Sequence, residues 1–166
     1  MKTETVSVTV NNKVYEFVVG NKFGQIQQNE TLLWTLRERL RLTGAKRGCE
    51  EGACGCCTVI IDEKAITSCM VLTAECDGKA ITTIEGLANP LTGALSPIQQ
   101  AFLDFYAFQC GYCTPGIIMT AKALLDANPH PTRGEIMEAL SGNHCRCISQ
   151  YHVLDAVEHV AKQGVK

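Results

Sequence analysis

The sequence predicts an α+β fold in which strands dominate the first half and helices the second. Residues 5–19 alternate apolar and polar side chains on both sides of Asn11 and Asn12, which is typical of a β-hairpin. Beyond residue 91, apolar residues recur instead at helical spacing. A chain of 166 residues can form one domain or two small ones. The change in pattern favours two, at residues 1–85 and 86–166.

The first half is expected to continue from the hairpin into one helix and two further strands. Apolar residues recur at helical spacing from 31 to 42, at Leu32, Leu33, Leu36 and Leu40. Gly44 stands where a C-cap glycine would end this helix. Short apolar runs at 58–61 and 80–84 predict two strands.

A turn-rich segment at 85–91 is expected to link the two halves, and every later element is predicted to be helical. Ser96 and Pro97 can start a helix that runs to about residue 108. Thr114 is the expected N-cap of the next helix, with Pro115 at its first position. Thr132 and Glu135 form a capping box. A last helix is predicted over about 149–163, with a buried stripe at Val153, Ala156, Val157 and Val160.

Eight of the ten cysteines fall into two ordered groups of four. The first group is Cys49-x4-Cys54-x2-Cys57-x11-Cys69, and the second is Cys110-x2-Cys113-x31-Cys145-x1-Cys147. The four-then-two spacing that opens the first group is that of plant-type 2Fe-2S ferredoxins, and thiolate is the soft ligand that such clusters need. Glycines at 48, 52 and 55 interleave with these cysteines and let the backbone approach a cluster. The pattern therefore predicts two iron–sulfur sites.

Other uses of cysteines are weighed against iron–sulfur binding. No secretory signal is visible at the N-terminus, so a reducing, cytoplasmic setting is expected and disulfides are disfavoured. Cys110 and Cys113 resemble a thioredoxin-type pair, but no strand–helix–strand context surrounds them. Zinc could occupy the second group on chemistry alone. A Rieske centre at His144 lacks its second histidine pattern. Cys56 and Cys76 are interpreted as bystanders, Cys76 as a small buried hydrophobe.

Several function classes are disfavoured by composition and motif content. A formal charge of −2 does not suggest nucleic-acid binding. No apolar run reaches the roughly 18 residues that a membrane span requires. Neither a G-x-G-x-x-G fingerprint nor a Walker loop occurs, and no catalytic constellation is seen. An active site is therefore expected on a partner.

Five motifs in order carry a family resemblance over nearly the whole chain. They are TGAKRGCEEGACGCCTV at 43–59, TSC ending at Cys69, TTIEGLA at 82–88, QCGYCTPG at 109–116 and GNHCRC at 142–147. The chain resembles the small iron–sulfur subunit of the molybdenum hydroxylase family, which includes xanthine dehydrogenases and aldehyde oxidoreductases. The resemblance implies an N-terminal β-grasp ferredoxin-like domain and an all-helical, four-helix-bundle domain, each with one 2Fe-2S cluster.

The same resemblance implies ligands, partners and a direction of electron flow. The N-terminal cluster would be bound by Cys49, Cys54, Cys57 and Cys69, and the C-terminal cluster by Cys110, Cys113, Cys145 and Cys147. Gln109 and Cys147 match positions that approach a molybdopterin carried by a large partner subunit. Electrons would pass from that centre through the C-terminal and then the N-terminal cluster, toward FAD in a medium subunit or another acceptor. The competing hypothesis is a free-standing ferredoxin-like carrier or a zinc-stabilised binding module.

The chain also departs from the family pattern. Cys56 stands where alanine is common, between the second and third ligands of the first loop. After Cys147, the usual threonine-glycine-tyrosine is replaced by Ile148-Ser149-Gln150. The segment 20–30 is a few residues longer than usual and is interpreted as a surface elaboration.

Overall fold

The computed structural model describes residues 4–164. Its first elements are β1 (Glu4–Val10) and β2 (Lys13–Val19), which pair in antiparallel register. Asn11 and Asn12 join them with positive φ angles of 48° and 64°, which asparagine tolerates better than most residues. The predicted hairpin is confirmed.

The sheet has five strands in the order β2-β1-β5-β3-β4. The additional strands are β3 (Thr58–Ile61), β4 (Lys64–Thr67) and β5 (Ala80–Thr82). β1 and β5 run parallel, whereas the other pairs are antiparallel. β4, a short strand with an exposed and a half-buried end, was not predicted from the sequence. The strand predicted over 80–84 ends earlier, because a 3₁₀ turn begins at Ile84.

The segment after β2 forms α1 (Leu32–Trp34), which continues directly into a π-helical turn at Thr35–Arg39. The predicted end at Gly44 is wrong. The helix stops at Leu40, and Arg41 takes the positive φ of 59° that ends it. Short 3₁₀ turns complete this half at Ser68–Met70, Thr73–Cys76 and Ile84–Gly86.

Four α-helices follow: α2 (Pro97–Asp104), α3 (Thr114–Ala127), α4 (Arg133–Ala139) and α5 (Gln150–Gln163), with a 3₁₀ turn at Leu140–Gly142. The capping box of Thr132 and Glu135 is present, and the predicted stripe of α5 is buried. Two details were wrong. α2 ends near Phe105 rather than 108, and the N-cap of α3 is Cys113 rather than Thr114.

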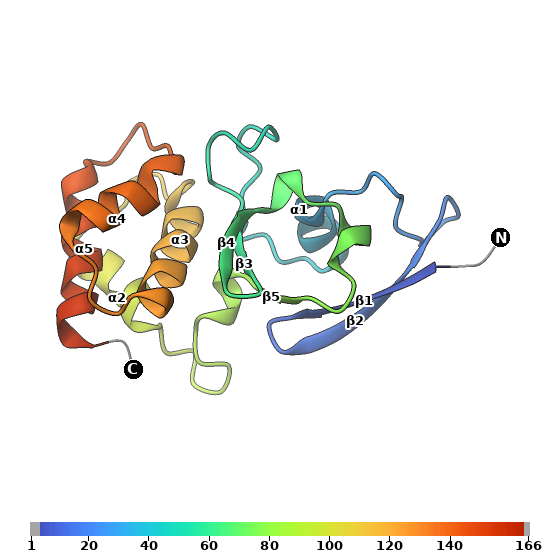
Figure 1. Cartoon of the computed structure of the whole chain (residues 1–166), viewed down its shortest axis with the longest axis horizontal. Helices are drawn as coiled ribbons and strands as arrows, with labels where there is room; N and C mark the ends of the chain where they lie inside the picture. Colours follow the sequence, from blue (N-terminus) through green and yellow to red (C-terminus); the bar gives the residue numbers. More distant parts are fainter. Residues whose placement is uncertain (1–3, 165–166) are drawn as a thin grey trace.

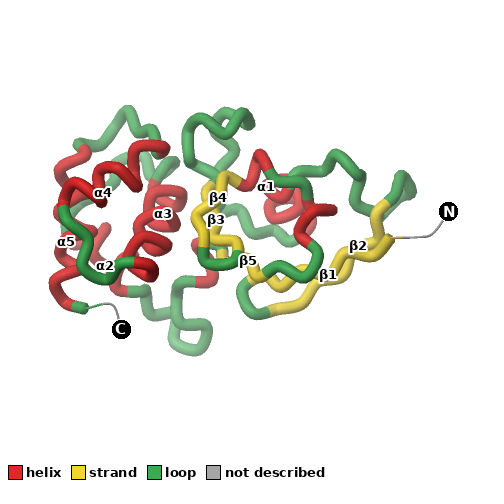
Figure 2. The backbone as a smooth tube through the Cα atoms, viewed as in Figure 1, coloured by secondary structure: helices red, strands yellow, loops and turns green. Residues whose placement is uncertain are grey.

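α2 to α5 gather on one side of the molecule, and the sheet lies on the other side together with α1 (Figures 1 and 2). Each side has its own apolar cluster, and α3 packs against β3 between them. Met119 and Ala123 of α3 bury Ile60 of β3, whereas Val59 and Ile61 are buried in the apolar cluster of the sheet, so β3 is covered on both faces. α3 thus joins the helices to the sheet at the level of the cysteine loops.

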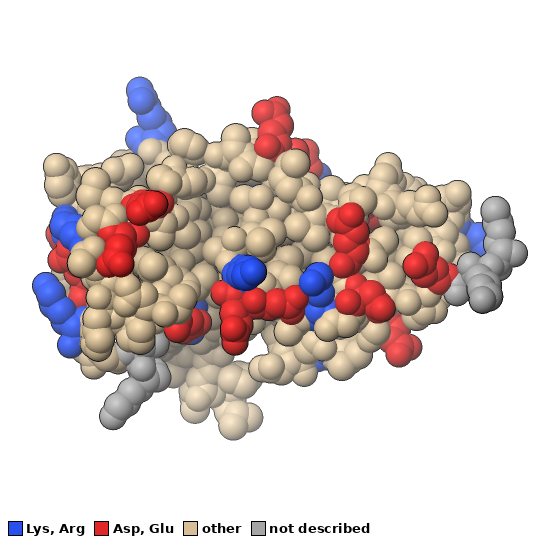
Figure 3. Space-filling model, in the orientation of Figure 1, with Lys and Arg blue, Asp and Glu red and all other residues tan. Residues whose placement is uncertain are grey.

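Acidic and basic side chains are interspersed on the face shown in Figure 3, without a continuous basic patch. Among the described residues, no helix is both long and apolar enough to cross a membrane.

Candidate functional site

The first cysteine group surrounds the start of β3. Cys49 and Cys54 lie half-buried in the loop before this strand, Cys57 is buried directly in front of it, and Cys69 is buried in the 3₁₀ turn after β4. The antiparallel register pairs Thr58 with Thr67, and this pairing carries Cys69 back to Cys57. Gly52 and Gly55 have positive φ angles of 75° and 69°, so the loop can curl its thiols inward.

In this group the Cys49 and Cys54 thiols contact one another, as do those of Cys57 and Cys69, and the Cys54 thiol also contacts Cys56. The backbone N–H of Glu51 donates to Cys49 Sγ at 3.4 Å. This bond, together with the Cys54 thiol, lowers the pKa of Cys49 to about 7. Burial and the Cys57 thiol raise the pKa of Cys69 to about 12. Amides aimed at sulfur also stabilise a bound, negatively charged cluster.

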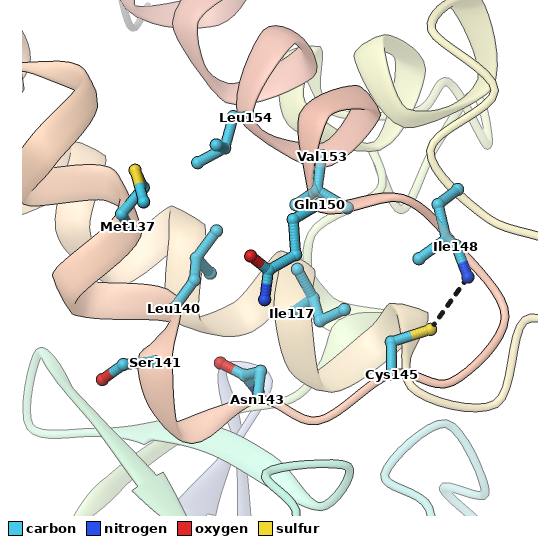
Figure 4. Close-up of a pocket in the computed structure, with 10 residues that line it drawn as sticks. All are labelled: Ile117, Met137, Leu140, Ser141, Asn143, Cys145, Ile148, Gln150, Val153 and Leu154. Atoms are coloured by element: carbon cyan, nitrogen blue, oxygen red, sulfur yellow. Dashed lines mark hydrogen bonds between the residues drawn. The ribbon is translucent and has the colours of Figure 1, made fainter.

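The second group lies at the starts of α3 and α5. Cys110 and Cys147 are exposed, with their Sγ atoms 3.6 Å apart, whereas Cys113 is buried and contacts half-buried Cys145. Burial opposes ionisation of Cys145, but the backbone N–H of Ile148, 3.4 Å from its Sγ (Figure 4), and the Cys113 thiol outweigh it and lower its pKa. The exposed pair marks the surface side of this group.

The arrangement of the thiols fits a 2Fe-2S cluster in each group. Such a cluster takes four cysteine ligands, two on each of its two irons. Each group accordingly presents two thiol pairs. Between residues 4 and 164, no three His, Cys, Asp or Glu side chains converge as the ligands of one ion would.

The remaining two cysteines have different surroundings. Cys76 is fully buried in the apolar cluster of the sheet. Cys56 lies between the two groups, where it joins the apolar cluster of the helices, and its thiol donates to the carbonyl of Cys54 at 3.8 Å. Gly116 allows α3 to lie against the backbone of Gly55 and Cys56, because a Cβ on Gly116 would lie only 2.1 Å from the carbonyl oxygen of Gly55.

Contacts between the two cysteine loops were not foreseen from the sequence. The Tyr112 hydroxyl donates to the carbonyl of Arg47 at 2.5 Å. The Asn143 amide donates to the carbonyl of Gly55 at 3.1 Å, and the backbone N–H of His144 donates to the carbonyl of Cys54 at 3.0 Å. The one feature of the sequence that could have pointed to Tyr112, Asn143 and His144 is that they lie close to cysteines of the second group. Gln109 is exposed beside Cys110.

A largely apolar cavity of about 300 Å³ lies next to Cys145. Figure 4 shows Gln150 projecting into it from the start of α5. The other lining residues are Ile117, Met137, Leu140, Ser141, Asn143, Ile148, Val153 and Leu154. Ile148 and Gln150, two of the three residues that depart from the family pattern, therefore form part of a cavity wall beside the second group.

Comparison with known proteins agrees with this architecture. A family model described as a 2Fe-2S iron-sulfur cluster binding domain matches residues 20–84, and one described as a 2Fe-2S binding domain matches residues 83–158. The fold resembles quinoline 2-oxidoreductase from Pseudomonas putida 86, with a TM-score of 0.85, 36% identity and 100% coverage of both chains.

Curated relatives include the nicotine 6-hydroxylase small subunit of Paenarthrobacter nicotinovorans, 49% identical over 80% of this chain and 78% of that protein. The nicotinate dehydrogenase small FeS subunit of Eubacterium barkeri is 43% identical over 98% of both chains. These matches favour iron–sulfur binding over zinc. The chain belongs to the small iron–sulfur subunits of the molybdenum hydroxylase family, the oxidoreductase subunits whose catalytic site lies on another chain.

Proposed function

We propose that this chain relays electrons from a molybdopterin centre in a large partner subunit, through two 2Fe-2S clusters, toward FAD in a medium subunit or another acceptor. The observation that carries the proposal is the arrangement of eight thiols as four contacting pairs in two adjoining loops. When bound, the clusters supply two one-electron carriers at these places.

The proposed ligands of the first cluster are Cys49, Cys54, Cys57 and Cys69. Those of the second are Cys110, Cys113, Cys145 and Cys147. Glu51 and Ile148 supply amide donors to one sulfur of each set, and such donors tune a reduction potential. A backbone hydrogen bond connects the two sets. The N–H of His144, which precedes the proposed ligand Cys145, donates to the carbonyl of Cys54, a proposed ligand of the first cluster.

The exposed side of the second group is the proposed contact with the large subunit. Cys110 and Cys147 are exposed, and so is Gln109. This exposure supports Gln109 and Cys147 as the residues that face the partner's molybdopterin. By contrast, Cys57 and Cys69 are buried. The relay would therefore enter at the exposed pair and leave through the N-terminal half.

Finer points of organisation belong to the same proposal. The separate apolar clusters support a division at residues 1–85 and 86–166, into a β-grasp ferredoxin-like domain and a helical domain. The four α-helices of the second half share one cluster, which supports a four-helix bundle. A cytoplasmic location is proposed because reduced thiols persist there.

The experiment is Cys113→Ser, compared with Cys76→Ser as the matched control, in the complex purified under anaerobic conditions. Cys113→Ser is expected to remove one of two electron paramagnetic resonance signals, reduce the iron from about four to about two per chain, and stop electron exit. Cys76→Ser is expected to keep both signals, because Cys76 lies in the sheet core. Normal turnover and two unchanged signals in the Cys113 variant would contradict the relay.

A further inference from the structure

The two cysteine loops are joined by one side chain from each of the two segments that carry the second group of cysteines. Tyr112 stands between Cys110 and Cys113, and Asn143 stands two residues before Cys145. Their hydroxyl and amide donate to backbone carbonyls of the first loop, at 2.5 Å and 3.1 Å. Both bonds span long sequence separations, so they help to fix how the loops lie relative to one another.

The two acceptors lie at opposite ends of the first loop. Arg47, which accepts from Tyr112, precedes Cys49 by two residues. Gly55, which accepts from Asn143, directly follows Cys54. The segment with Cys110 and Cys113 and the segment that leads to Cys145 are therefore attached to different ends of the first loop. Two separated attachments restrict rotation as well as distance, which a single attachment cannot do.

The contact between the loops is tight at the Asn143 end. A Cβ on Gly55 would lie 2.4 Å from Asn143 Nδ2 and 2.6 Å from the carbonyl oxygen of Gly142. Gly55 also has a φ of +69°, which favours glycine. At the other end Tyr112 is 47% exposed, so its bond lies at the rim. The backbone bond from His144 to the carbonyl of Cys54 lies directly beside the Asn143 bond and cannot be removed by changing a side chain.

We propose that Tyr112 and Asn143 are positioning residues for electron transfer between the two clusters, because they fix the separation and orientation of the loops that hold them. The proposal rests on the proposed ligand sets. Electron transfer and the magnetic interaction between two reduced clusters both weaken steeply as the clusters move apart. Neither residue is required to bind a cluster, so their loss should change the coupling of the clusters and leave the clusters in place.

The experiment uses Tyr112→Phe, Asn143→Ala and the double variant in the cluster-loaded protein, with whatever partner chains co-purify. The readouts are iron content, the signal of each reduced cluster, and the spin–spin splitting between the two. The double variant is expected to retain its iron and both signals, to lose much of the splitting, and to transfer electrons between clusters several-fold more slowly after flash reduction. Each single variant should give a smaller change.

Matched controls are Tyr151→Phe, at a 71% exposed position on α5, and Asn128→Ala, whose side chain accepts from the backbone of His130 beyond α3. Both should leave the splitting unchanged. An unchanged splitting in the double variant would overturn the positioning role, and loss of a cluster would overturn it in favour of a role in cluster binding. Two signals in the unchanged protein test the proposed function separately, and absence of the second signal would overturn both.

Discussion

At the scale of single residues, Cys56 and Cys57 are adjacent but have different surroundings. The Cys57 thiol contacts Cys69, whereas the Cys56 thiol contacts the Cys54 thiol, donates to the Cys54 carbonyl and packs in the apolar cluster of the helices. Cys57→Ala is therefore expected to lose one cluster, about half of the iron, and Cys56→Ala to lose none. Iron analysis and the visible absorption of the two variants check this. Iron loss from the Cys56 variant alone would assign that residue as the ligand instead.

The sequence could predict which thiols gather locally but not how they pair. The spacing of Cys49, Cys54 and Cys57 confines them to one loop, and the structure places them there. The pairing of Cys69 with Cys57 depends on β4, a strand that sequence analysis missed, because the register of Thr58 against Thr67 brings the chain back. The bonds of Tyr112 and Asn143 were likewise invisible, since they join residues 65 and 88 positions apart.

At the scale of secondary-structure elements, a buried polar network holds the π-helical turn against the sheet half. Glu30 is 7% exposed and is bound by Arg39 Nε and Nη2 at 2.7 Å. The Thr35 hydroxyl donates to Glu30 at 2.5 Å and contacts the Thr73 hydroxyl at 2.7 Å. Hydrophobic spacing predicted the helix itself, but such spacing contains no information on this network or on the early end at Leu40.

Removal of Glu30 tests the importance of the network. Glu30→Ala leaves the Arg39 guanidinium and the Thr35 hydroxyl without their acceptor, and is expected to cost about 2–3 kcal/mol, or roughly 5–10 °C in the unfolding midpoint. Glu16→Ala, at an exposed position on β2, is the control and should cost little. Thermal unfolding followed by circular dichroism measures both, and equal midpoints for the two variants would contradict the prediction.

The same network predicts a dependence on pH. Burial alone would raise the pKa of Glu30, but the bonds from Arg39 and Thr35 outweigh it, and the pKa lies below its ordinary value of 4.5. A lowered pKa gives stability that is present above 4.5 and is lost as the pH falls through the lower, folded-state value. The midpoints of the unchanged protein and Glu30→Ala should therefore converge in acid. A difference that stays constant from neutral pH into that range would exclude Glu30 as the titrating group.

At the scale of the whole molecule, exposed apolar side chains gather near the exposed thiols. Leu103, Tyr106 and Phe108, which precede Gln109 and Cys110, are 44%, 78% and 37% exposed. Leu103 and Phe108 line a cavity of about 270 Å³ with Thr114, whose buried hydroxyl has no partner within residues 4–164. Exposed apolar surface of this kind is typical of a contact that a partner completes.

This surface predicts where assembly with the large subunit can be weakened. Leu103→Glu places an unpaired charge in the expected contact, and burying that charge costs binding free energy. Because a loss of about 1.4 kcal/mol weakens binding tenfold, we expect association with the large subunit to weaken at least about tenfold. Phe23→Glu is the matched control, since Phe23 is fully exposed but lies in the sheet half, in the segment 20–30. Sedimentation of the co-expressed complexes would measure both, with iron content as the check on folding. Dissociation by Phe23→Glu and not by Leu103→Glu would move the partner contact to the opposite half of the chain, away from the exposed pair of Cys110 and Cys147.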